Sequence, residues 1–142
     1  MINEYMTEVH RHCDSHFAKA EQDAADGNLV GASKTFAQFH QQMERHFAME
    51  EKVLFPAFEQ ATGMTSGPTQ VMRMEHIQMR SLFEEMQHSL AEKDTSQYLG
   101  LGETLLILMQ QHNMKEEQIL YPMADRTLAA DSEAVLTQMQ SL

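Results

Sequence analysis

The sequence is poor in the residues that interrupt helices and in those that favour sheets. It has three prolines, six glycines and no tryptophan among 142 residues. Valine and isoleucine are scarce, whereas alanine, leucine, methionine, glutamine and glutamate, which favour helices, dominate. Because 42% of the residues are hydrophobic, a core can form, and the length suits one domain. We therefore expect an all-α fold in a single domain over residues 1–142.

Three further absences limit the classes of function. Cys13 is the only cysteine, so no internal disulfide can form. The formal net charge is −11 and no run of lysine and arginine occurs, which argues against nucleic acid or an anionic membrane as a general partner. No apolar run is long enough to cross a bilayer, and the first residues, Met1 to Tyr5, do not read as a secretory signal. We expect a soluble cytoplasmic protein.

Turn signals divide the chain into four long helical segments. Breaks are predicted at Asp26–Asn28, Thr62–Pro68 and Lys93–Ser96, and apolar residues recur at helical spacing between them. Long segments with short connections predict an up-down-up-down four-helix bundle. A short terminal helix is expected after Asp131, where Asp131 or Ser132 can cap it.

The two halves of the chain repeat one pattern. Residues 46–56 and 112–122 both read H-x-x-x-E-E-x-[VI]-L-[FY]-P, and they lie 66 positions apart. The same offset carries His10 onto His76. We therefore predict two copies of one helical hairpin, at about residues 2–60 and 68–126.

The spacing within the repeat predicts that its polar residues converge. In each H-x-x-x-E the histidine and the glutamate lie one turn apart on the same helix face. The midpoint of His10 and His46 is residue 28, and that of His76 and His112 is residue 94, so each midpoint falls in a predicted turn. Each hairpin therefore brings two histidines to one level. Each second glutamate, at positions 51 and 117, is expected to contact the cluster from outside or to face solvent.

This inventory of donors predicts a metal site. A single H-x-x-x-E is usually a surface pair, but two copies with matched partner histidines favour metal binding. Nitrogen and carboxylate ligands without thiolates suit iron, manganese or zinc, and bundle cores hold dinuclear carboxylate sites in this way. The predicted metal ligands are His10, His46, Glu50, His76, His112 and Glu116.

The repeated motif resembles the hemerythrin-like, HHE cation-binding family, from about Met6 to Asp125. The resemblance implies two iron ions with oxo or hydroxo and carboxylate bridges, in a protein that binds oxygen, nitric oxide, peroxide or a related small ligand. Oxygen-carrying hemerythrins have a second histidine four residues after the third-helix histidine, where this chain has Arg80. This departure weakens the case for reversible oxygen carriage and favours relatives with six ligands, some of which handle nitric oxide, peroxide or iron.

Several neighbouring residues have two interpretations. Asp14 and Arg80 occupy equivalent positions and can form an ion pair near the site, or Asp14 can add a ligand, or both can be ordinary polar residues. Four methionines near the histidines can line an apolar pocket or simply fill the core. We interpret Cys13 as buried and inert. The remaining histidines fail the repeat test and are predicted to be exposed or incidental, with His16 as the one competitor of His10. These histidines are His12, His16, His40 and His88.

The sequence leaves three functions open. The first is a di-iron protein that binds oxygen or nitric oxide for storage, sensing or scavenging. The second is a redox enzyme that acts on peroxide or nitric oxide with a separate electron donor, or a protein of iron handling and stress repair. The third is a bundle that a metal, such as zinc, merely stabilises. A haem bundle fits less well, because haem needs two axial ligands and no C-x-x-C-H motif is present.

Overall fold

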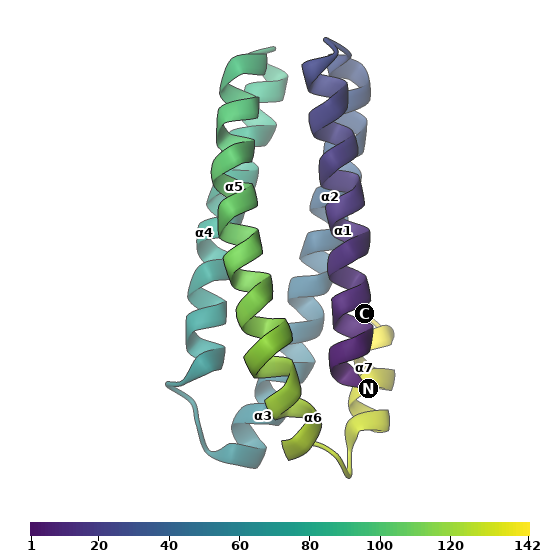
Figure 1. Cartoon of the computed structure of the whole chain (residues 1–142), viewed down its shortest axis with the longest axis vertical. Coiled ribbons are helices and arrows are strands. Elements are labelled where there is room, and N and C mark those ends of the chain that lie inside the picture. The colour runs from purple at the N-terminus through teal and green to yellow at the C-terminus, as the bar shows by residue number, and fades with distance from the viewer.

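The computed structural model describes residues 1–142, and it is all-helical with no strand. Four long helices run side by side, alternately up and down, as Figure 1 shows. They are α1 (Ile2–Ala25), α2 (Leu29–Met49), α4 (Pro68–Ala91) and α5 (Thr95–Lys115). The predicted all-α, up-down-up-down bundle is confirmed. No helix combines the length and the apolar character that a membrane span requires.

The second and fourth long helices each continue through a wide π-turn. The π-turn η1 (Glu50–Leu54) leads into α3 (Phe55–Thr62), and η2 (Glu116–Leu120) leads into α6 (Tyr121–Thr127). A proline, Pro56 or Pro122, follows each π-turn by two residues. In a regular α-helix the proline ring would clash with the carbonyl four residues earlier, and a wider turn avoids that clash. The helical path therefore does not end at the prolines.

The two tight hairpin turns are built alike. Asn28 caps α2 by accepting from the amide of Gly31 at 3.0 Å, and Asp94 caps α5 by accepting from the amide of Gln97 at 3.0 Å. The residue before each cap has a left-handed backbone, with φ 78° at Gly27 and φ 58° at Lys93. The turns thus preserve the offset of the repeat even where the residue type differs.

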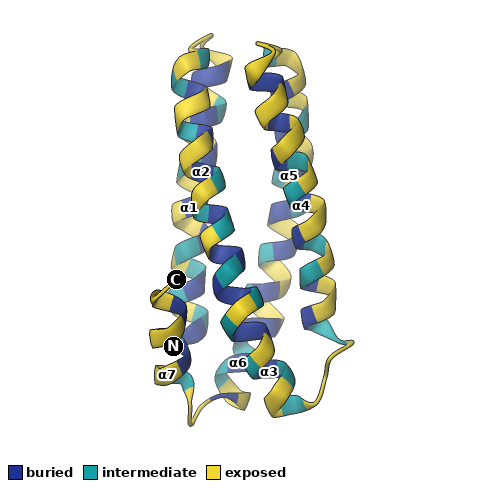
Figure 2. Cartoon of the chain, turned by 180° about the vertical axis from the view of Figure 1, so that it is seen from behind, coloured by how far each residue is buried: buried dark blue, intermediate teal, exposed yellow.

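Two apolar clusters form the core, one on each side of a buried polar layer. The first fills the half of the bundle toward the turns at Gly27 and Lys93, and the second lies toward α3, α6 and the short C-terminal helix α7 (Ser132–Gln140). Figure 2 shows the buried side of the long helices facing inward. The predicted terminal helix is confirmed. The four methionines belong to these clusters, with Met43 and Met109 in the first and Met6 and Met72 in the second.

Candidate metal centre

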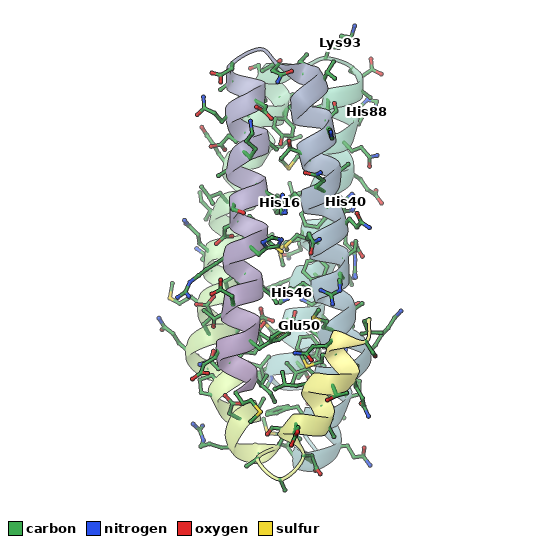
Figure 3. The ribbon with its side chains drawn as sticks, turned by 90° about the vertical axis from the view of Figure 1, so that its right-hand side faces the viewer. His16, His40, His46, Glu50, His88 and Lys93 are labelled. Carbon is green, nitrogen blue, oxygen red and sulfur yellow. The ribbon has the colours of Figure 1, made fainter.

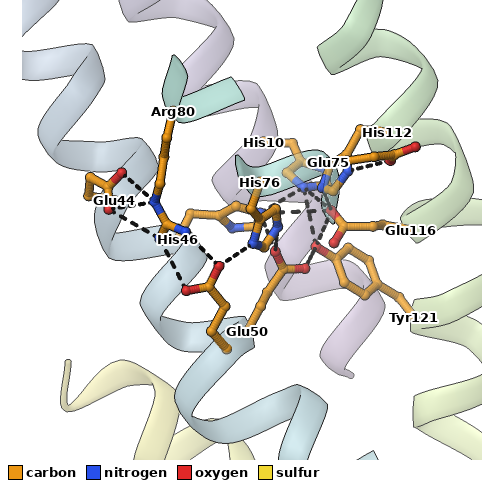
Figure 4. Close-up of polar contacts among 11 residues, drawn as sticks. His10, Glu44, His46, Glu50, Glu75, His76, Arg80, His112, Glu116 and Tyr121 are labelled. Atoms are coloured by element: carbon orange, nitrogen blue, oxygen red, sulfur yellow. Dashed lines mark hydrogen bonds and ion pairs between the residues drawn. The ribbon is translucent and has the colours of Figure 1, made fainter. Parts of the chain in front are cut away.

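The polar layer between the two clusters consists of the six side chains that the sequence singled out. The two glutamates are fully buried, and none of the four histidines is more than 3% exposed. Figure 4 shows them converging from α1, α2, η1, α4, α5 and η2. They are His10, His46, Glu50, His76, His112 and Glu116. The structure thus brings all six together, as the spacing predicts, whereas their role as metal ligands stays a prediction.

The donor atoms fall into two groups that share Glu116. One group contains Glu50, His76, His112 and Glu116, and the other contains His10, His46 and Glu116. Within each group the atoms that can bind a metal lie within 4.8 Å of one another. Two adjoining groups with a common carboxylate suit a pair of cations better than a single one.

Several buried atoms of this layer have no hydrogen-bond partner. They include Nε2 of His76 and of His112, Oε1 of Glu50 and Oε2 of Glu116. Oε1 of Glu50 lies 3.1 Å from His76 Nε2 and 3.2 Å from His46 Nε2, without a hydrogen bond. Buried polar atoms are rarely left unsatisfied, because the loss of hydration is costly. A cation between these lone pairs would satisfy them, so the residues present fit a metal.

The outer nitrogens of three imidazoles are held by carboxylates. Nδ1 of His10 donates to Glu117 at 2.6 Å, and Nδ1 of His76 donates to Glu51 at 2.6 Å. A carboxylate accepts a proton at Nδ1, so a neutral ring turns the lone pair of Nε2 inward, as metal binding requires. Glu51 and Glu117 therefore contact the cluster from outside, which is one of the two placements expected of them.

The third imidazole of this kind is His112, whose Nδ1 donates to Glu75 at 2.8 Å, and Lys115 also bonds that carboxylate. The fourth imidazole, His46, breaks the pattern because its Nδ1 is buried and has no partner. The repeat explains this difference, because the position equivalent to Glu75 is Val9, which offers no acceptor. The repeat therefore predicted the inner donors but not this outer partner.

The buried charges shift the pKa values of the cluster. Burial would lower the pKa of His46, but Glu50 and Glu116 outweigh burial and raise that pKa to about 10. Burial would raise the pKa of Glu116, but the neighbouring histidines, His112 first, hold it well below its usual value. At Glu51, burial is likewise outweighed by His76 and Arg80, and the pKa falls to about 2. The layer thus stabilises positive charge, which is the property that a cation site needs.

Arg80 is turned away from the ligand cluster. Its guanidinium donates to Glu44 and to Glu51, with the shortest contacts at 2.9 Å, and it lies over the ring of Phe47. It therefore supports His76 through Glu51. Asp14, its counterpart, is exposed and makes no ion pair with Arg80. The Asp14–Arg80 ion pair considered from the sequence is therefore absent, and Arg80 pairs with Glu44 and Glu51 instead.

The other histidines and Cys13 lie outside the cluster. His12 and His88 are exposed, while His16 and His40 are partly buried and join neither donor group. Figure 3 shows His88 near the Lys93 end of the bundle, far along the molecule from Glu50. Cys13 is 2% exposed, and burial followed by Asp14 raises the pKa of its thiol to about 12. An inert thiol, as predicted, fits these properties.

Tyr121 also contacts the cluster, which the repeat did not predict. Its hydroxyl lies 2.8 Å from Glu50 Oε2, 2.9 Å from Glu116 Oε1 and 3.2 Å from His10 Nε2. It follows Glu116 by five residues, and the π-turn between them brings both onto one face. The equivalent residue in the first half is Phe55, so the repeat itself gave no signal for the phenol.

The family model for the hemerythrin HHE cation-binding domain matches residues 1–124. The chain belongs to this family. No solved structure matches it.

The curated relatives carry a more specific description. The chain is 32% identical over 118 residues to an iron–sulfur cluster repair protein, YtfE, of Citrobacter koseri, a match that covers 75% of this chain and 53% of the relative. The YtfE proteins of Escherichia coli O81 and O1:K1 match over the same shares, at 32% and 31% identity. The chain thus spans about half the length of the curated relatives it matches.

Proposed function

We propose that this chain holds two iron ions and handles iron in the repair of iron–sulfur clusters under stress. The observation that carries the proposal is the layer of six buried donors whose inner atoms lack hydrogen-bond partners. The similarity to relatives named for iron–sulfur cluster repair supports this choice over oxygen storage. The proposed ligands are His10, His46, Glu50, His76, His112 and Glu116.

The lone cysteine limits what the 142 residues do in such repair. An iron–sulfur cluster is commonly held by four thiolates, whereas Cys13 is single and buried. The chain is therefore proposed to supply or remove iron rather than to carry the cluster itself. Iron bound here would also supply redox chemistry, and a redox role would need a separate electron donor.

The chain's own residues prepare the site for this task. The carboxylates of Glu51, Glu75 and Glu117 orient three imidazoles, and the apolar clusters above and below exclude water. We propose that the two hairpins, residues 2–60 and 68–126, are copies of one unit within a single domain. This origin would explain why each half contributes two histidines and one glutamate.

The test joins a metal measurement to an activity measurement. The iron-loaded protein is mixed with an enzyme whose iron–sulfur cluster has been damaged, and the activity that this enzyme regains is measured. The same measurement is made with a free iron salt that supplies an equal amount of iron. The protein should outperform the salt, and His10→Ala should lose both the iron and the effect. His16→Ala serves as the matched control, because His16 joins neither donor group. Recovery no better than with free iron would contradict the repair role.

Reversible binding of oxygen or nitric oxide is the second candidate. Four histidines serve both donor groups and leave room for an added ligand. Arg80, which Glu44 and Glu51 engage, stands where oxygen carriers have a fifth imidazole, and this difference counts against oxygen carriage in particular. Stopped-flow absorption of the reduced iron protein with each gas separates the candidates. A stable band that disappears when the gas is removed favours carriage, whereas irreversible oxidation favours repair or turnover.

A further inference from the structure

The hydroxyl of Tyr121 faces more acceptors than it has protons. It lies within 3.2 Å of Glu50 Oε2, Glu116 Oε1 and His10 Nε2. His10 donates from Nδ1 to Glu117, so a neutral ring presents the lone pair of Nε2 to the phenol. The single O–H can satisfy only one of these three atoms. Tyr121 is fully buried, so solvent cannot satisfy the other two.

The same distances match those between neighbouring ligands on one metal ion. Metal–ligand bonds of about 2.1 Å that meet at right angles separate two ligand atoms by about 3 Å. The hydroxyl oxygen lies 2.8 Å from Glu50 Oε2, 2.9 Å from Glu116 Oε1 and 3.2 Å from His10 Nε2. His46 Nε2, at 3.1 Å from His10 Nε2, completes the donors on this side. Figure 4 shows the phenol directed into the cluster from α6.

The two donor groups are unequal without Tyr121. The group around His76 and His112 has two histidines and two carboxylates, whereas the group around His10 and His46 has only Glu116 besides its histidines. Tyr121 approaches the poorer group through its contact with His10. The equivalent residue in the repeat, Phe55, has no oxygen and packs near His76, at 5.8 Å between ring centroids. The phenol therefore reaches a histidine of the poorer group, although its hydroxyl also contacts Glu50 of the richer group.

We propose that the phenolate oxygen of Tyr121 is a seventh protein ligand, bound to the ion that His10, His46 and Glu116 hold. The inference rests on the metal centre proposed above. When the ion binds, the O–H bond of the phenol breaks, an oxygen–metal bond forms, and the proton leaves to solvent without electron transfer. With this seventh ligand each group has four protein donors, so Tyr121 removes the difference in donor number between the two ions.

Optical spectroscopy of the ferric protein tests this ligand directly. A phenolate bound to ferric iron gives a charge-transfer band in the visible, and excitation into that band enhances the tyrosine ring vibrations in the Raman spectrum. The iron-loaded protein should show both features, and Tyr121→Phe should lose them while keeping two irons per chain. Tyr98→Phe is the matched control, because Tyr98 is also buried and its hydroxyl has no partner.

The outcomes of this experiment separate the ligand role of Tyr121 from the existence of the two-iron centre. Two irons per chain without the band would overturn the ligand role of Tyr121 and leave the centre intact. Fewer than two irons in the unmodified protein would instead count against the centre. If Tyr121→Phe failed to fold or to keep iron, the Raman spectrum of the unmodified protein with ring-deuterated tyrosine would still decide. Ring modes that shift with deuterium support the ligand, and the absence of ring modes contradicts it.

Discussion

The carboxylate of Glu75 joins the outer nitrogen of His112 to Lys115, and it has no counterpart in the first half of the chain. A partner of this kind fixes both the tautomer and the orientation of a metal-binding imidazole. Glu75→Ala should therefore weaken metal binding by about 10–100-fold while leaving the helices intact. Titration with a metal-binding competitor measures the change. Glu84→Ala, at an exposed position of the same helix, should leave the affinity unchanged, and an equal loss in both variants would contradict the account.

Much of the residue-scale arrangement could be predicted from the sequence. The repeat and the hairpin midpoints placed the six inner donors together and preferred His10 to His16, which joins neither donor group. The features that could not be predicted are those that break the repeat. Glu75 aligns with Val9, and Tyr121 aligns with Phe55, so no internal comparison could identify them. Their contacts depend on the packing of one hairpin on the other.

At the scale of single elements, the turn between α4 and α5 contains a strained residue. Lys93 has φ 58°, a left-handed conformation that costs a side-chain-bearing residue about 1–2 kcal/mol. Its counterpart, Gly27, adopts the same conformation without a Cβ, at φ 78°. Lys93→Gly should therefore stabilise the protein by about 0.5–1 kcal/mol, after the greater chain entropy of glycine is subtracted. Urea unfolding measures this change.

The reciprocal substitution provides the control for this turn. Gly27→Ala introduces a Cβ at a positive φ and should destabilise the protein, although no atom lies within 4 Å of the added group. A loss at Gly27 with a gain at Lys93 would attribute both effects to the backbone conformation. Destabilisation by Lys93→Gly would show that the lysine side chain contributes more than its strain costs.

A second element-scale prediction concerns the link between α3 and α4. Glu59 on α3 accepts from Thr69 at 2.6 Å and from Arg73, both on α4. Burial would raise the pKa of Glu59, but the bonds from Arg73 and Thr69 outweigh it and lower that pKa below 4.5. A lowered pKa in the folded state stabilises the protein above pH 4.5, and this contribution is lost as the pH falls through the lowered value.

Thermal unfolding of the metal-free protein below pH 4.5 tests this link. The unfolding midpoint of the unmodified protein should fall with decreasing pH. The midpoint of Glu59→Gln should fall less steeply, because this variant has no carboxylate to protonate at position 59. Glu85→Gln, at an exposed position, should keep the original slope. If the unfolding midpoint of Glu59→Gln fell with pH as steeply as that of the unmodified protein, the carboxylate of Glu59 would not be a source of this pH dependence.

The prolines show where element-scale prediction from the sequence was incomplete. Pro56 and Pro122 lie beyond the donor level, where a proline would be expected to end or kink a regular helix. The helical path instead continues, because the π-turns η1 and η2 provide a wider backbone before each ring. Propensity rules describe regular helices, so they gave no signal for a π-turn.

For the whole molecule, the polar layer divides the core into two apolar clusters. Without a cation, buried lone pairs in this layer remain unsatisfied, so metal binding and folding are expected to be coupled. At free metal of about 100 times Kd, binding stabilises by about 2.7 kcal/mol, or about 5–10 °C in Tm. Removal of metal by a chelator should lower Tm by this amount, and metal added back should restore it. A Tm that does not respond to metal would contradict the coupling.

The number of iron ions per folded chain tests the central claim most directly. Elemental analysis of the anaerobically iron-loaded protein, after removal of loose iron, should give two irons per chain. Glu50→Ala removes a carboxylate that lies 3.1 Å from His76 Nε2 and 3.2 Å from His46 Nε2, and it should retain one iron or none. One iron or none in the unmodified protein, or two in Glu50→Ala, would contradict the account.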